Sequence, residues 1–279
     1  MLITSMVIFG TIGLLVRNIP LPSAEIALYR AVLAAMLLGS YFLAAGQKIQ
    51  IRALGKELPL LILSGAAMGF NWILLFEAYN YTTVSVATLS YYFAPVIVTA
   101  VCPVLFREKM GAKQWICFAM STLGIVLITG IGDMGEGRQH PLGIGFGLGA
   151  AVLYATVILL NKCIKGVAGI QRTFLQFLSA ICVLVPYVLT TTGIHVQMLN
   201  AIGWMNLLVV GLIHTGVTYC LYFSALKDLP GQTAAILSYI DPLVAVLLSV
   251  FVLGETITGI QLLGGVLILG FTLYNELIT

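Results

Sequence analysis

The chain has 279 residues, of which 60 % are hydrophobic and 8 % are charged, and its formal net charge is +3. Soluble domains carry about 25 % charged residues, so this composition excludes an ordinary water-soluble protein and indicates an integral membrane protein. The basic residues lie mainly in short loops and form no basic and aromatic stripe, so we expect no nucleic-acid partner.

Ten apolar runs are long enough to cross a lipid bilayer as helices. They cover residues 1–17, 23–45, 57–79, 83–106, 112–131, 141–162, 169–191, 201–226, 230–253 and 258–277. Weak alternation of apolar and polar residues within these runs favours helices over a transmembrane barrel. We therefore predict an all-α integral membrane protein with ten transmembrane helices, a multi-pass protein of the cell (inner) membrane.

The basic residues of the loops predict the orientation of the chain. With the N-terminus inside, the outer loops hold only Arg17 and Arg138. The inner loops then hold ten basic residues: Lys48, Arg52, Lys56, Arg107, Lys109, Lys113, Lys162, Lys165, Arg172 and Lys227. Cytoplasmic loops are enriched in Lys and Arg, so both termini are predicted to be cytoplasmic.

Two stretches of the chain, residues 76–114 and 223–261, match at a fixed offset of 147 residues. The matched pairs include Phe76 with Phe223, Tyr92 with Tyr239, Pro95 with Pro242, Glu108 with Glu255 and Gln114 with Gln261. The halves 1–131 and 141–279 hold five predicted spans each, and an odd number makes the second half enter from the opposite face. The sequence therefore predicts two five-helix domains in a 5+5 inverted-topology repeat, which many secondary transporters use.

Three features carry a resemblance to a known family: Gly10 in the first span, "IALYRAVLAA" at 26–35, and the segments in which "AP" or "DP" is followed by a glutamate. Through them the whole chain resembles a ten-helix member of the drug/metabolite transporter superfamily, of the EamA type. The resemblance implies alternating access and a central cavity lined mainly by spans 1, 3 and 4 and spans 6, 8 and 9. It implies a small-molecule substrate without defining which one.

Asp241 is the only charged residue between positions 233 and 253. It is predicted to lie near the bilayer midplane, where an acid is costly, and Pro242 beside it should kink the helix. One hypothesis is a protonation or cation site that couples to transport. The alternative is a structural acid, hydrogen-bonded to a neighbouring hydroxyl. The matching first-half residue is Ala94, so the acid is not part of the repeated scaffold.

Two further charged or titratable positions lie inside predicted spans. His214, in the middle of span eight, is either part of a proton relay with Asp241 or a structural hydrogen-bonding residue. Arg30 and Glu77 lie at comparable depth and are interpreted first as an ion pair that fixes helix packing. Arg30 has two alternative partners, a substrate carboxylate and Glu25.

Aromatic residues are dense in the spans expected to line a cavity. We predict that Trp72, Tyr91, Tyr219 and Tyr239 line it together with Asn71, although tyrosines near helix ends also form interfacial belts. Trp72 and Tyr219 correspond at the repeat offset and are candidates to face each other. Glycines at 145 and 149 have the spacing of a close helix contact.

No cofactor or metal site is predicted, and the chain is not expected to be an enzyme. The "GIGDMG" stretch at 130–135 matches a dinucleotide-binding pattern but follows a membrane span without a strand, so we reject it. His140 and His195 lie in outer loops with no assigned role. The five cysteines show no pairing or metal-binding pattern.

The predicted function is therefore proton-coupled export of amino acids or related small metabolites by alternating access, in a monomer or homodimer, with protons as the coupling ion. The alternatives are an uncoupled facilitator or exchanger, or an exporter of drugs or cationic compounds in which Asp241 binds the substrate. A membrane receptor or scaffold is the alternative without transport.

Overall fold

The computed structural model describes residues 1–47, 55–106, 111–128, 140–167, 169–226, 237–238 and 240–278. These residues are predominantly helical, and no strand occurs among them. Five helical stretches in this described part are long and apolar enough to cross a membrane. They are α3 (Ser23–Ala44), η1 with α5 (Gly55–Glu57, Leu58–Tyr81), α9 (His140–Cys163), α10 (Gly169–Thr191), and α11 (Ala201–Leu208) continued by η3 (Val209–Val217) and α12 (Thr218–Leu226).

Shorter apolar helices occupy the other predicted spans. They are α1 (Leu2–Gly10), α2 (Ile12–Val16), α6 (Val84–Tyr91), α7 (Ala94–Phe106), α8 (Ala112–Ile128), α14 (Ile240–Phe251) and α15 (Gly259–Ile278). The prediction of an all-helical membrane protein is confirmed. Ten crossings, the repeat and the orientation stay predictions, and several basic loop residues lie outside the described residues, as does the stretch 130–135.

Proline and a side-chain cap explain where the fourth predicted span is divided. The hydroxyl of Thr83 accepts a hydrogen bond from the backbone N–H of Val86 at 3.2 Å and so caps the start of α6. α6 ends at Tyr91, and α7 begins at Ala94 with Pro95 in its first turn, where the missing N–H of proline costs no helical hydrogen bond.

The described part of span nine has the same proline arrangement. Asp241 and Pro242 lie in the first turn of α14, so the carboxylate sits at the beginning of this helix. Residue 239 and residues 227–236 lie outside the described residues, so the predicted kink stays a prediction.

The eighth span contains an element that hydropathy did not predict. Between α11 and α12 the chain forms the wider π-helix η3. Within it the hydroxyl of Thr215 donates to the carbonyl of Val210 at 2.8 Å, and the hydroxyl of Thr218 donates to that of Ile213 at 2.7 Å. Both acceptors lie five residues back, which is the π-helical spacing.

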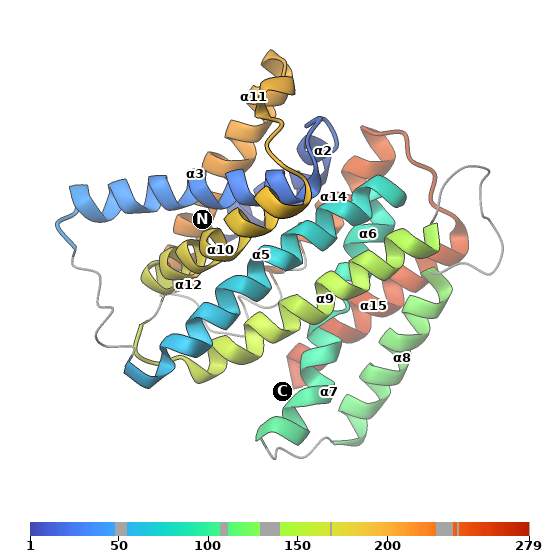
Figure 1. The fold of residues 1–279 in the computed structure, drawn as a ribbon. Coiled ribbons are helices and arrows are strands. Elements are labelled where there is room, and N and C mark those ends of the chain that lie inside the picture. Colours follow the sequence, from blue (N-terminus) through green and yellow to red (C-terminus); the bar gives the residue numbers. More distant parts are fainter. Residues whose placement is uncertain are drawn as a thin grey trace.

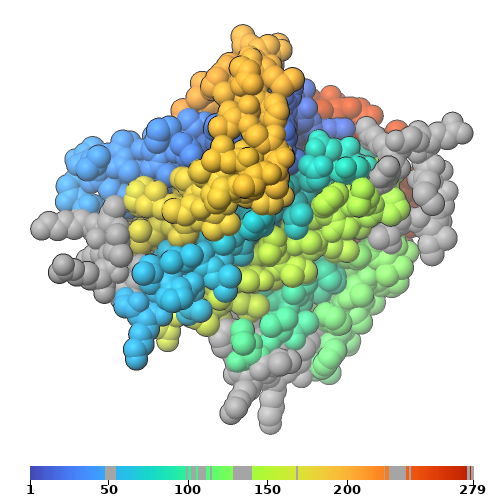
Figure 2. Space-filling view, viewed as in Figure 1, coloured from blue at the N-terminus to red at the C-terminus, as the bar shows by residue number. Residues whose placement is uncertain are grey.

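Two helix pairs dominate the packing. α9 runs beside α5, and α8 runs beside α15, while α3 crosses α10 (Figure 1). α5 and α9 form adjoining bands across one face of the space-filling view (Figure 2). Phe76 and Phe177 are completely enclosed, whereas Leu43, Leu189 and Phe251 are exposed. Exposed apolar side chains of this size suit contact with lipid.

Candidate functional site

A cavity of about 440 Å³ lies among the helices of both halves of the chain. This volume is within the usual range for small-molecule sites. Each of the predicted spans 1, 3, 4, 6, 8 and 9 contributes described lining residues, and spans 2 and 7 add further ones. The side chains used below are Arg30, Trp72, Tyr91, Tyr92, Tyr154, Asn161, Thr173, Gln176, Tyr219, Asp241 and Ala245.

Asp241 supplies the negative charge of the cavity. The hydroxyl of Tyr92, just beyond α6, donates a hydrogen bond to its Oδ2 at 2.5 Å. Tyr92 also lines the cavity, so both ends of this contact are available to a bound solute. The hydroxyl partner expected for a structural acid is therefore present, while a role in coupling stays a prediction.

Arg30 supplies the positive charge. It is buried, with only 4 % of its surface exposed. Its Nε donates to the hydroxyl of Thr215 at 2.5 Å, and its guanidinium carbon lies 4.3 Å from the ring centre of Trp72. Within the described part of the chain no carboxylate pairs with Arg30, so ring faces and hydroxyls are what stabilise this cation.

The structure does not form the predicted ion pair between Arg30 and Glu77. Glu77 instead accepts hydrogen bonds from Ser23 at 2.6 Å and Asn80 at 3.3 Å. Ser23 and Arg30 are seven residues apart on α3, which corresponds to about 10 Å along the helix. Glu77 therefore lies at the end of α3, away from the guanidinium.

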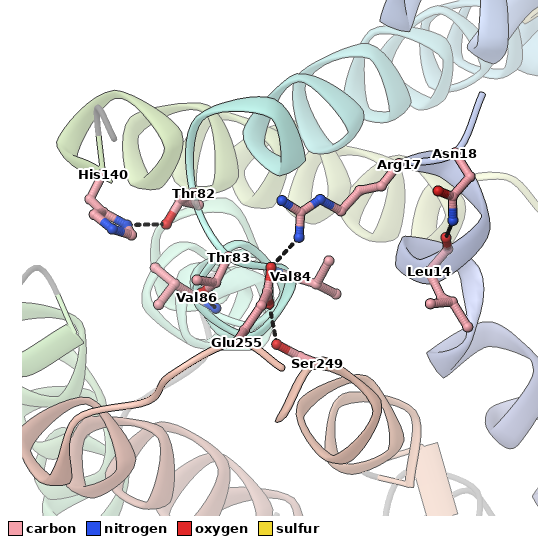
Figure 3. Close-up of polar contacts among 10 residues, drawn as sticks. All are labelled: Leu14, Arg17, Asn18, Thr82, Thr83, Val84, Val86, His140, Ser249 and Glu255. Atoms are coloured by element: carbon pink, nitrogen blue, oxygen red, sulfur yellow. Dashed lines mark hydrogen bonds and ion pairs between the residues drawn. The ribbon is translucent and has the colours of Figure 1, made fainter. Parts of the chain in front are cut away.

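Glu25, the other predicted partner of Arg30, is also occupied. Its carboxylate contacts the Nδ1 atom of His195 at 2.7 Å and accepts the backbone N–H of the same residue at 2.8 Å. His195, to which the sequence assigned no role, thus joins its loop to the start of α3. His140 likewise contacts Thr82 at 2.7 Å (Figure 3).

The aromatic wall includes residues that the sequence reasoning did not select. Trp72 and Tyr219 do not stack on each other; Phe177 contacts both, with ring centres 5.7 and 5.5 Å away. Elsewhere in the cavity, Tyr91 and Tyr154 are stacked with their centres 5.2 Å apart. Phe177, in α10, is fully enclosed behind these rings and is not among the lining residues.

Besides Glu77, two predicted site residues lie outside the described lining of the cavity. The side-chain amide of Asn71 donates to the backbone carbonyl of Ala150 at 2.6 Å and so joins α5 to α9. His214 contacts the hydroxyl of Thr11 at 2.6 Å and does not reach Asp241. Tyr239 lies outside the described residues.

An amide cluster at one end of the cavity was not predicted. The Nε2 atom of Gln176 donates to the hydroxyl of Ser64 at 2.6 Å and to Oδ1 of Asn161 at 2.8 Å. Gln176 and Asn161 both line the cavity. Only their proximity across α5, α9 and α10 reveals this cluster, because the three residues are far apart in sequence.

An apolar, all-helical exterior around a cavity with two opposite charges is the arrangement of a membrane transporter of small compounds. The chain belongs to the EamA-like transporter family, whose model matches residues 1–130 and 141–275. It is a multi-pass membrane transporter and not an enzyme.

Similar proteins agree with this class. Over 268 residues the chain is 31 % identical to an uncharacterized transporter, YxxF, of Bacillus subtilis (strain 168), covering 96 % of this chain and 85 % of that one. It is 26 % identical over 230 residues to the protein PecM of Dickeya dadantii (strain 3937), covering 78 % and 75 %. A protein crystal structure shares the fold with a TM-score of 0.67 at 16 % identity, covering 99 % of this chain and 95 % of that one.

Proposed function

We propose that the chain exports amino acids or related compounds across the cell (inner) membrane, exchanging them for protons by alternating access. One observation carries the proposal: a buried cation without an acidic partner among the described residues, Arg30, lines the same cavity as a carboxylate, Asp241. A zwitterion presents the complementary pair of charges.

Each wall of the cavity has a part in substrate binding. Arg30 has a planar set of donors that suits a carboxylate, and a buried charge is stabilised when a counter-ion arrives. Asp241 and the ring faces of Tyr91 and Tyr154 suit an ammonium group. The volume of about 440 Å³ leaves room for an apolar side chain beside the aromatic wall.

Proton coupling follows from competition at Asp241. The carboxylate binds either a substrate ammonium or a proton, and the two exclude each other at one pair of oxygens. The protein changes between its inward-open and outward-open states only when substrate or proton is bound. It therefore exchanges one for the other. The inward proton gradient then drives substrate outward. Tyr92 holds the carboxylate in place during this exchange.

Alternating access is supported by the repeat. The family model matches two separate stretches that coincide with the two halves of the chain. Two similar halves of opposite topology open one side of a central site while they close the other.

An exporter of organic cations is a second candidate, because Asp241 lies among stacked tyrosines. Arg30 in the same cavity repels a cation and favours the zwitterion.

The test is flux in proteoliposomes that contain a pH-sensitive dye. Wild type and Asp241→Asn are compared on a panel of amino acids, their amides, amines and aromatic metabolites. Glu57→Gln is the matched acid-to-amide control, because Glu57 accepts backbone N–H groups of Lys165 and Gly166 away from the cavity lining.

We expect substrate-dependent proton movement in wild type and Glu57→Gln, and its loss in Asp241→Asn. Flux without proton movement in wild type would overturn the coupling and leave a facilitator. Transport of amines and not of amino acids would replace the zwitterion with the cationic substrate. No flux for any compound would reject the proposed function.

A further inference from the structure

A single buried carboxylate joins three helix ends on one side of the molecule. Glu255, in the loop after α14, accepts hydrogen bonds from Arg17 Nη1, from the hydroxyl of Ser249 and from the backbone N–H of Val84, the last at 2.9 Å (Figure 3). Its side chain is 4 % exposed, against 25 % for Arg17. We call these four residues the outer latch.

The latch connects the two halves of the chain. Arg17 follows α2, and Val84 is the first residue of α6, both in the first half. Ser249 and Glu255 belong to α14 and the loop after it, in the second half. In the orientation predicted from the loop charges, all these helix ends face outward. The latch therefore ties the halves together on the outer side.

Close helix packing lies directly beneath the latch. A Cβ atom on Gly10 would lie 2.6 Å from the carbonyl oxygen of Asp241 and 2.7 Å from the Cβ of Val244. A Cβ atom on Gly13 would lie 2.6 Å from a methyl group of Val84. At these two glycines the first predicted span is in direct contact with α14 and with α6.

The opposite end of the cavity has a different character. Its lining there comes from Asn161, near the end of α9, and from Thr173 and Gln176, in the first turns of α10. In the predicted orientation these ends face the cytoplasm. The cavity lining thus extends from Tyr79, near the outer end of α5, past Asp241 to these inner helix ends, and the latch lies beyond its outer part.

We infer that the outer latch is the outer gate of the transporter, closed in this structure, and that the ion pair between Arg17 and Glu255 keeps it closed. This inference rests on the proposed alternating access. Loss of the ion pair shifts the protein toward states open to the outside, because an uncompensated buried carboxylate destabilises the closed arrangement.

The experiment measures access to the cavity without any substrate. A single cysteine replaces Ala245, a cavity-lining residue of α14, in a chain whose five native cysteines are replaced. Intact cells receive a membrane-impermeant thiol reagent, and the labelling rate is compared with the latch intact and in Arg17→Gln. Asn18→Ala is the matched control, because Asn18 adjoins Arg17 but its side-chain amide donates to the carbonyl of Leu14, outside the latch (Figure 3).

We expect labelling to be about tenfold faster in Arg17→Gln and unchanged in Asn18→Ala, in line with typical coupling between sites. The double exchange Arg17→Glu with Glu255→Arg restores opposite charges but not the acceptor for Val84. Its labelling rate should therefore lie between the two. This variant also provides a test if Arg17→Gln fails to insert.

Equal labelling rates with the latch intact and in Arg17→Gln would overturn the inference. Rapid labelling of the protein with an intact latch, at a rate that Arg17→Gln does not increase, would also overturn it. Flux measurements on the same variants separate the two proposals. A latch effect without flux of any compound removes the proposed function alone, and normal flux without a latch effect removes the gate alone.

Discussion

Replacing Arg30 with methionine separates a binding role from a packing role. The change removes the hydrogen bond to Thr215 and the contact with Trp72. These are worth about 1.5–3 kcal/mol for a charged donor and about 2 kcal/mol for a desolvated cation over a ring. The change also removes a buried cation, whose desolvation costs several kcal/mol. The terms oppose each other, so we expect the free energy of unfolding to change by only about 1–2 kcal/mol.

Substrate binding should change far more. Removing one partner of a buried charge pair costs about 2–5 kcal/mol, which corresponds to at least about thirtyfold in affinity. We expect the half-saturation concentration for amino acids to rise by this factor in the Arg30→Met variant. It should change little for the matching amino-acid amides, which lack the carboxylate. Arg30→Lys keeps the charge without the planar donors and should lie between.

The assays are concentration-dependent flux in proteoliposomes and thermal unfolding in detergent. Equal losses for an amino acid and its amide would refute the assignment of the carboxylate to Arg30. The ring contact alone is worth about 2 kcal/mol. If the unfolding free energy of Arg30→Met falls by well over that amount, the lost contacts of Arg30 outweigh the cost of burying its charge.

Two further predictions concern stability. Phe177→Ala removes a fully enclosed ring that contacts Trp72 and Tyr219, and it should lower the unfolding free energy by about 3–5 kcal/mol in thermal unfolding of the purified protein. Asn71→Leu leaves the carbonyl of Ala150 without this donor and should cost about 1–3 kcal/mol, while half-saturation of flux stays unchanged because Asn71 lies outside the described cavity lining.

Helix positions were predictable because lipid sets the length of an apolar run. α3 occupies Ser23–Ala44 where the prediction was 23–45, and α10 occupies Gly169–Thr191 where it was 169–191. Hydropathy averages over a window, so it cannot detect a change in helix type. The π-helix η3, which carries the Thr215 hydroxyl that accepts from Arg30, was therefore not predicted.

Contacts between helices were less predictable, because they depend on which face of each helix points inward. Glycines 145 and 149 are predicted at a close helix contact. A Cβ on Gly149 would lie 3.1 Å from a methyl group of Leu74, but one on Gly145 meets nothing within 4 Å. Tighter contacts belong to Gly143 and Gly147, against Thr82 and Ser90. They have the same spacing on a neighbouring face. The predicted pair of Arg30 and Glu77 was also wrong, because Glu77 bonds to Ser23 at the start of α3 and so lies at a different depth from Arg30.

The predicted repeat gives a reason why the charged residues are the best candidates for function. At the offset of 147 residues, Arg30 corresponds to Phe177, and Trp72 corresponds to Tyr219. In the structure Arg30 lies over Trp72, and Phe177 packs against Tyr219, so each half places a planar group against a ring. Packing is satisfied equally by phenylalanine and by the stem and guanidinium of arginine.

Only one half carries the charge, as only one half carries Asp241 opposite the alanine at position 94. A scaffold that needed these charges for folding would need them in both halves, because each half places a planar group against a ring at these corresponding positions. The cost of burying Arg30 and Asp241 is therefore expected to be offset by what the cavity binds. This asymmetry is the physical reason to look for the substrate between Arg30 and Asp241.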